Sequence, residues 1–164
     1  MELNKFSLFK GLSSVQITKF ERVITRKNFQ INDEIIKEGD AGDSLIFLLE
    51  GEVKISKPLT LVTNKNDYDD REKEMITLNS SINPFFGDYS LFTDNNERTA
   101  NITANSNGEI GILMANDFFQ ICEADYQLGY LVIKNLTKNI TNHVVKQGDD
   151  ILKLTTAISL ILEN

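Results

Sequence analysis

The sequence is poor in the residue types that build metal and thiol chemistry. Its 164 residues include one histidine, His143, and one cysteine, Cys122. Transition-metal sites in enzymes draw on several imidazole or thiolate ligands, so a metal-dependent enzyme of that kind is excluded. A single cysteine also excludes an internal disulfide, and with no signal-like N-terminal segment we expect a reducing cytoplasm. Cys122 is expected to be a small buried hydrophobic residue.

Long apolar runs, nucleotide-binding glycine signatures and an excess of positive charge are also missing. No apolar stretch approaches the length of a membrane-spanning helix. Walker and dinucleotide-fold glycine patterns are absent, and no nucleophile motif accompanies the single histidine. The 24 acidic and 17 basic side chains give a net charge of −7, which argues against a general nucleic-acid binder. We therefore expect no enzyme activity, no membrane and no nucleic acid as partner.

The chain has the length of one domain, with strands in its middle and helices at both ends. Residues 25–115 hold about eight short apolar segments, separated by turns rich in Gly, Asp and Asn. Residues 1–24 and those from 116 onward have helical spacing, with caps expected at Ser13 or Ser14 and at Asn116 or Asp117. The fold class is therefore α+β: an eight-stranded antiparallel β-roll (double-stranded β-helix or jelly roll), flanked by N-terminal helices and a long C-terminal helix.

Residues 85–104 contain the clearest candidate for a binding site. They read F-F-G-D-Y-S-L-F-T-D-N-N-E-R-T-A-N-I-T-A. Gly87 lets the backbone approach a ligand closely, and the four residues after it can form one helical turn whose free N–H groups face an anion. Arg98 adds a permanently charged fork that matches two phosphate oxygens. Asp88 would repel an anion, so it is expected to face a sugar hydroxyl.

This segment resembles the phosphate-binding cassette of the cyclic nucleotide-binding domain family, most of all its bacterial catabolite-activator type. The resemblance implies that Arg98 and Thr99 bind the cyclic phosphate, beside Gly87 and the Ser90 backbone. It also implies that Asp88 binds the ribose 2′-hydroxyl, although the family usually has Glu there, which is one methylene longer. The expected nucleotide-binding residues are Phe86, Gly87, Asp88, Tyr89, Ser90, Arg98, Thr99 and Ala100.

The C-terminal helix has two candidate roles. From Ile133 an apolar series with alternating three- and four-residue spacing predicts a coiled-coil-like seam: Ile133, Thr137, Ile140, Val144, Gln147, Ile151, Leu154, Ile158 and Ile161. The helix either packs back on its own roll or pairs in a two-fold homodimer, which is favoured because the seam outruns the roll. In the activator-like branch this helix also closes over the base, and the candidate base contacts here are Ile140, His143 and Val144.

The resemblance covers about residues 6–147. We expect a cyclic nucleotide-binding domain at 1–147 (helices 1–24, β-roll 25–115, C-terminal helices from 116) and a helical extension at 148–164. The expected function is a non-catalytic cyclic nucleotide sensor without a cofactor. Its ligand, cAMP or cGMP, is held by the cassette Gly87–Ala100, and its signal passes through the C-terminal helix to an unknown protein partner. Three alternatives stay open. One is a degenerate roll that acts only as a dimerisation or interaction scaffold, and another is a hydrolase or other enzyme on a similar roll, which the near-absence of His and Cys disfavours. The third is that the cassette is an ordinary turn with a surface Glu97–Arg98 ion pair.

Overall fold

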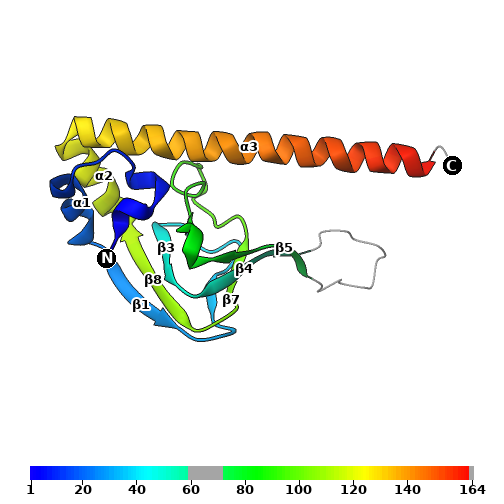
Figure 1. The fold of residues 1–164 in the computed structure, drawn as a ribbon, viewed down its shortest axis with the longest axis horizontal. Coiled ribbons are helices and arrows are strands. Elements are labelled where there is room, and N and C mark those ends of the chain that lie inside the picture. Colours follow the sequence, from blue (N-terminus) through cyan, green and yellow to red (C-terminus); the bar gives the residue numbers. More distant parts are fainter. Residues whose placement is uncertain (59–71, 163–164) are drawn as a thin grey trace.

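The N-terminal helices cap one end of the roll. The computed structural model describes residues 1–58 and 72–162 (Figure 1). It begins with two 3₁₀ turns and a helix: η1 (Leu3–Lys5), η2 (Ser7–Phe9) and α1 (Ser14–Glu21). The expected cap at Ser13 is confirmed: its hydroxyl accepts from the Gln16 N–H at 3.3 Å, and the Gln16 side chain accepts from the Ser13 N–H at 3.0 Å.

Eight strands follow in the described residues and form two four-stranded antiparallel sheets. In chain order they are β1 (Thr25–Phe29), β2 (Glu34–Ile36), β3 (Ser44–Glu50), β4 (Glu52–Pro58), β5 (Glu72–Asn79), β6 (Phe85–Phe86), β7 (Asn101–Ala104) and β8 (Gly108–Met114). The sheet orders are β1-β8-β3-β6 and β2-β7-β4-β5. The predicted eight-stranded antiparallel roll with flanking helices is confirmed. The segment between β6 and β7 passes from one sheet to the other, which places the cassette across the two sheets.

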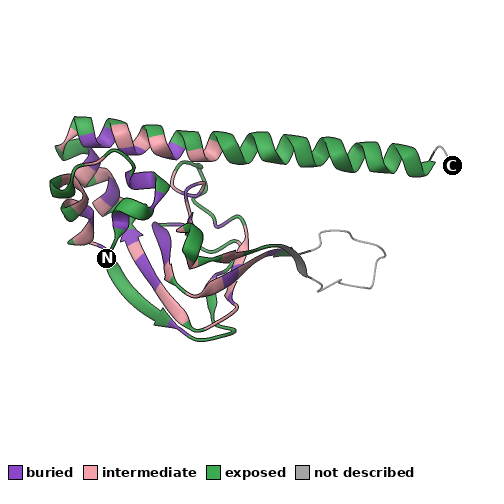
Figure 2. Ribbon diagram, in the orientation of Figure 1, coloured by how far each residue is buried: buried purple, intermediate pink, exposed green. Residues whose placement is uncertain are grey.

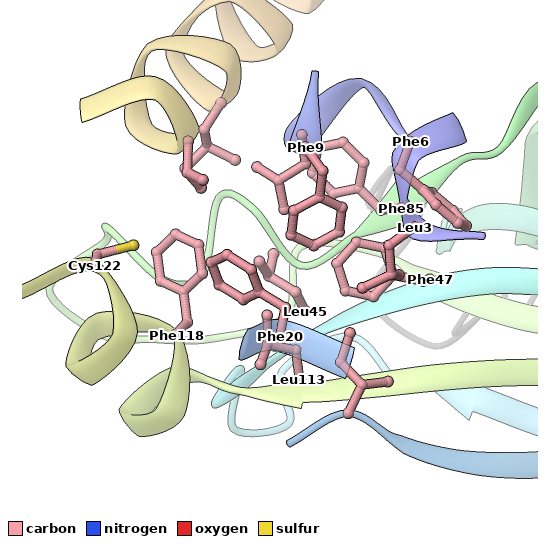
Figure 3. Close-up of a cluster of buried hydrophobic side chains, with 14 of the residues drawn as sticks. Leu3, Phe6, Phe9, Phe20, Leu45, Phe47, Phe85, Leu113, Phe118 and Cys122 are labelled. Carbon is pink, nitrogen blue, oxygen red and sulfur yellow. The ribbon is translucent and has the colours of Figure 1, made fainter. Parts of the chain in front are cut away.

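The core consists of two clusters on opposite faces of the first sheet. Successive side chains of a strand point to opposite faces, so β3 directs Leu45 and Phe47 toward the helices and Leu48 toward the second sheet. Figure 3 shows the helix-side cluster, where aromatic rings from the 3₁₀ turns, α1, α2 and the sheet point toward one another. Phe85 belongs to this cluster and Phe86 to the other one. Burying a Phe stabilises a fold by about 1.5–3 kcal/mol, so this pair fixes the point where the cassette begins.

Two helices complete the chain, α2 (Ala115–Ala124) and α3 (Tyr126–Leu162). The expected cap of α2 at Asn116 or Asp117 is wrong. The helix begins at Ala115, directly after β8, and the Ala115 N–H donates to the Asp43 carbonyl at 2.7 Å instead of to a side chain. None of the described helices is both long and apolar enough to cross a membrane.

The long helix α3 has two parts with different surroundings. Its first turns lie over α2 and the N-terminal helices, with Leu128, Val132 and Leu136 buried. From Thr141 on, every described residue is exposed and the helix projects past the roll (Figure 2). The helix continues through Gly148 without a break. The division into a domain and an extension after residue 147 stays a prediction.

Candidate functional site

The cassette folds tightly around a single glycine. Gly87 has φ +91°, a conformation that disfavours residues with a side chain. A Cβ at this position would lie 2.3 Å from Arg98 Nη1 and 2.5 Å from the Ser44 carbonyl oxygen. The next residues form a hydrogen-bonded turn rather than the expected helical turn, and the Ser90 hydroxyl donates to the Gly87 carbonyl at 3.0 Å. Gly87 therefore leaves the space into which the Arg98 side chain extends.

Arg98 is buried beneath this turn with only neutral partners. It is 7% exposed. Its Nη1 donates to the Ser44 carbonyl at 2.9 Å and the Ser90 hydroxyl at 3.3 Å, and its Nη2 donates to the Ser44 hydroxyl at 2.8 Å. Among the described residues no carboxylate oxygen lies within 4 Å of the guanidinium. Burial lowers the pKa of Arg98, and the nearby Asp43 and Asp40 carboxylates oppose that shift.

The surroundings of Arg98 exclude the alternative of an ordinary turn with a surface ion pair. Glu97 is exposed and accepts a hydrogen bond from Asn95 at 3.0 Å. Arg98 instead points inward, and its backbone pairs with the turn before β3: its N–H donates to the Asp40 carbonyl and its carbonyl accepts from Gly39, both at 2.9 Å. A buried cation without a paired anion is costly.

The other end of the cassette contacts α3. Asp88 is 5% exposed, and its Oδ2 accepts from Asn139 Nδ2 at 3.2 Å. Burial raises the pKa of Asp88, while the nearby His143 side chain, the Asn139 hydrogen bond and nearby backbone N–H groups oppose that shift. The Tyr89 ring stacks on His143 with centroids 6.4 Å apart. The Tyr89 hydroxyl is buried without a hydrogen-bond partner in the part of the chain that the structure describes.

A sequence model of the cyclic nucleotide-binding domain family matches residues 26–125. The chain belongs to this family. The match includes the cassette and all of the roll except Thr25, the first residue of β1, and it ends at the residue before α3.

Three similar proteins illustrate how far the likeness extends. The cGMP-dependent protein kinase isozyme 1 of Drosophila melanogaster is 30% identical over 118 residues, which cover 72% of this chain and 14% of the kinase. The catabolite activator protein of Thermus thermophilus has a TM-score of 0.73 at 22% identity, covering 92% of this chain and 63% of that one. A cyclic nucleotide-binding domain from Methylobacillus flagellatus has a TM-score of 0.74 at 23% identity, covering 92% and 78%.

These likenesses differ in what they establish. At 22% and 23% identity, the two solved structures show a shared fold and no more. The chain spans about a seventh of the kinase, so the activity of the whole kinase does not transfer to it. The cyclic nucleotide-binding domain itself is the region of similarity.

The structure brings most of the expected site residues of this domain together. Gly87, Ser90 and Arg98 form one hydrogen-bonded group, and Asp88 and Tyr89 face His143 on α3. The remaining expected residues are arranged less closely: Phe86 is in the core, Thr99 is exposed, Ala100 and Ile140 are half-buried, and Val144 is 55% exposed. Their contacts with a ligand stay predictions.

Two residues at the site were not predicted from the sequence. Within the described residues, Ser44 accepts two of the three hydrogen bonds of the Arg98 side chain, and Asn139 donates to Asp88. Ser44 follows the turn 38–43, whose resemblance to the first hairpins of the family was a usable signal. Asn139 lies one helical turn before His143, on the same face of α3, which could also have marked it.

Proposed function

We propose that this domain binds a cyclic nucleotide, cAMP or cGMP, and acts as a non-catalytic sensor. The observation that carries the proposal is the buried Arg98 guanidinium, which has no carboxylate partner among the described residues. A cyclic phosphate has one negative charge and two free oxygens, which match the fork of an arginine. Thr99 would contact the same phosphate and Asp88 the ribose 2′-hydroxyl.

Ligand binding on this account exchanges partners at Arg98. The guanidinium gives up hydrogen bonds to neutral oxygens of Ser44 and Ser90 and makes charge-assisted bonds to the phosphate. Ser90 also donates to the Gly87 carbonyl, so the exchange shifts the turn that includes Asp88 and Tyr89. Because these two residues contact α3, the ligand favours one position of that helix by differential binding. No bond is made or broken in the ligand.

The base is expected to lie against α3, near Ile140, His143 and Val144. The stacked Tyr89 and His143 rings offer an aromatic surface to a purine. The unpartnered Tyr89 hydroxyl offers a hydrogen bond. We favour cAMP from the activator-like cassette, while the kinase relative is named for cGMP.

The output is proposed to pass through a homodimer of α3. Its exposed part presents Val144, Ile151, Leu154, Ile158 and Ile161 in the predicted seam. A second copy of the same seam would bury these side chains in a two-fold coiled coil. The change in α3 would then reach an unidentified protein partner.

Ligand-dependent stabilisation tests the proposal. Thermal unfolding is followed in the presence of cAMP, cGMP or the control 5′-AMP, whose phosphate is not closed into a ring with the ribose. At a concentration 100 times its Kd, a ligand specific for the folded state stabilises it by about 2.7 kcal/mol. We expect a raised Tm with at least one cyclic nucleotide and a much smaller change with 5′-AMP. Equal Tm values with and without both cyclic nucleotides would favour the scaffold alternative.

A further inference from the structure

One hydrogen bond links the cassette to α3 at the residue expected to recognise the ribose. Asn139 Nδ2 donates to Asp88 Oδ2 at 3.2 Å, across 51 residues of sequence. In the described part of the chain, Asn139 is the only side chain that donates to this carboxylate. The nearby backbone N–H groups of Asp88 itself and Tyr89 oppose the rise that burial causes in its pKa.

We propose that Asn139 is a positioning residue for ribose recognition, holding the Asp88 carboxylate where it accepts from the ligand's 2′-hydroxyl. The inference rests on the proposed function and adds one requirement to it. The domain distinguishes a ribose from a 2′-deoxyribose only while α3 is packed on the roll.

The short side chain of Asp88 explains why a positioning residue is needed. Asp has one methylene less than Glu, so its carboxylate stays near its own backbone, whose N–H groups favour the ionised form. Asn139 contacts Oδ2 from the opposite element and so restrains the orientation of the carboxylate. A carboxylate has about four lone-pair sites. One amide hydrogen and the backbone donors still leave room for a hydroxyl.

Asn139 can hold Asp88 because α3 is itself fixed at this point. One turn earlier, Asn135 Nδ2 donates to two backbone carbonyls of the N-terminal helices, those of Leu8 at 3.0 Å and Lys10 at 2.8 Å. Between the two asparagines, Leu136 is buried in the helix-side core. Asn139 therefore lies at the end of the partly buried section of α3: every described residue from Thr141 on is exposed, and His143 keeps one ring contact, with Tyr89.

The arrangement has a reciprocal consequence. If a packed α3 strengthens the bond between Asp88 and the 2′-hydroxyl, then the 2′-hydroxyl strengthens the packing of α3 by the same factor. A ligand that lacks this hydroxyl would bind more weakly and also fix α3 less well. A residue that only blocked Asp88 would act in the opposite sense, since its removal would tighten binding.

The test compares cAMP and cGMP with their 2′-deoxy analogues by calorimetric titration. The proteins are the unaltered chain, Asn139→Ala, the near-isosteric Asn139→Leu, and the control Asn142→Ala, which changes an exposed asparagine of the same helix. Loss of a hydrogen bond to a charged group weakens binding about tenfold or more. We expect the unaltered chain and Asn142→Ala to bind the 2′-deoxy analogue more weakly than the ribose form by about this factor. The ratio to compare is the Kd of the 2′-deoxy analogue divided by the Kd of the ribose form. In both Asn139 variants this ratio should fall to within about threefold of unity, mainly because the ribose form binds more weakly.

An unchanged ratio in the Asn139 variants, or tighter binding of the ribose form, would overturn the inference while leaving the proposed function intact. If neither cyclic nucleotide bound the unaltered chain, the proposed function would fail, and the inference with it.

Hydrogen exchange tests the inference on the unaltered chain alone, so the result does not depend on whether a variant folds. At saturation, the ribose ligand should slow exchange across residues 126–140 more than its deoxy analogue does. Equal protection by the two ligands would also overturn the inference.

Discussion

Two charged side chains at the site are buried where a protein selected only for stability would have neutral ones. Arg98 has neutral hydrogen-bond partners, and Asp88 is surrounded by an amide, backbone N–H groups and His143. Burying an ionised group is unfavourable unless its interactions offset the lost hydration. Both residues therefore lower the stability of the ligand-free domain and hold charge where a ligand with a phosphate and a ribose would use it.

Asp88→Asn should stabilise the domain at neutral pH. Burial raises the pKa of Asp88 above its usual 3.8, so the folded state holds this proton more tightly than the unfolded state does. The stabilising contribution is therefore complete below about pH 3.9 and is lost as the pH rises through the raised pKa. We expect the variant to have a Tm about 2–4 °C higher at pH 7, with a smaller gain near pH 4.

Calorimetric scans at both pH values measure this effect. Asp94→Asn, which changes an exposed carboxylate in the same loop, is the control and should leave the Tm nearly unchanged. An Asp88→Asn protein that is less stable than the unaltered chain at pH 7 would show that the ionised carboxylate stabilises the fold.

The sequence predicts individual site residues only where one local motif includes them. Gly87, Asp88 and Arg98 belong to one short stretch, and the structure brings them to one site. Ser44 and Asn139 come from 54 residues before Arg98 and 51 residues after Asp88. Their contacts depend on how the roll closes and where α3 lies, which local spacing does not specify. The disfavoured alternative, a surface Glu97–Arg98 ion pair, is wrong because Arg98 is buried, and that burial is a property of the tertiary fold.

At the scale of elements, alternating apolar residues and turn residues predict the strands well, and helix ends less well. The Ser13 capping box is local in sequence and is confirmed. The cap of α2 is supplied by the carbonyl of Asp43, on the loop before β3, and no local pattern around Asn116 could indicate it. The helix α3 is correctly expected to be long, but only its first half has a tertiary partner among the described residues.

Gly148→Ala should strengthen the exposed half of α3. A Cβ at Gly148 would have no heavy atom within 4 Å, so the alanine side chain fits without a clash. Alanine favours a helix interior over glycine by up to about 1 kcal/mol. We expect more negative ellipticity at 222 nm and slower amide exchange around residues 145–160, with cyclic nucleotide affinity little changed. Faster exchange in this segment would contradict a continuous helix through residue 148.

At the scale of the whole molecule, α3 holds most of the large apolar side chains that are exposed in the described residues. Exposed apolar side chains repeat along it from Val144 to Ile161, beyond the reach of the roll. In proteins most helical stability comes from packing of an apolar face, and this part of α3 has no such packing among the described residues. A second copy would cover the seam and stabilise the helix, so the coiled-coil-like seam and the homodimer are expected together.

Ile158→Asp should therefore convert a dimer into a monomer. Ile158 is exposed and lies on the seam, where a carboxylate would be buried against the partner helix. Light scattering after size exclusion should give about twice the 18.6 kDa chain mass for the unaltered protein and the single chain mass for the variant. The control Ser159→Asp changes the next exposed residue, off the seam, and should stay dimeric. A monomeric unaltered protein at tens of micromolar would refute the α3 dimer.

Calorimetric titration of the unaltered chain and Arg98→Ala with cAMP and cGMP tests the central claim most directly. Loss of the charge-assisted phosphate contact should weaken binding by about 1.5–3 kcal/mol or more, roughly tenfold to over a hundredfold. Circular dichroism confirms that the variant folds. We expect at least one cyclic nucleotide to bind the unaltered chain and its affinity to fall strongly in the folded variant. Equal affinity of the two proteins, or no binding heat and no stabilisation with either nucleotide, would contradict it.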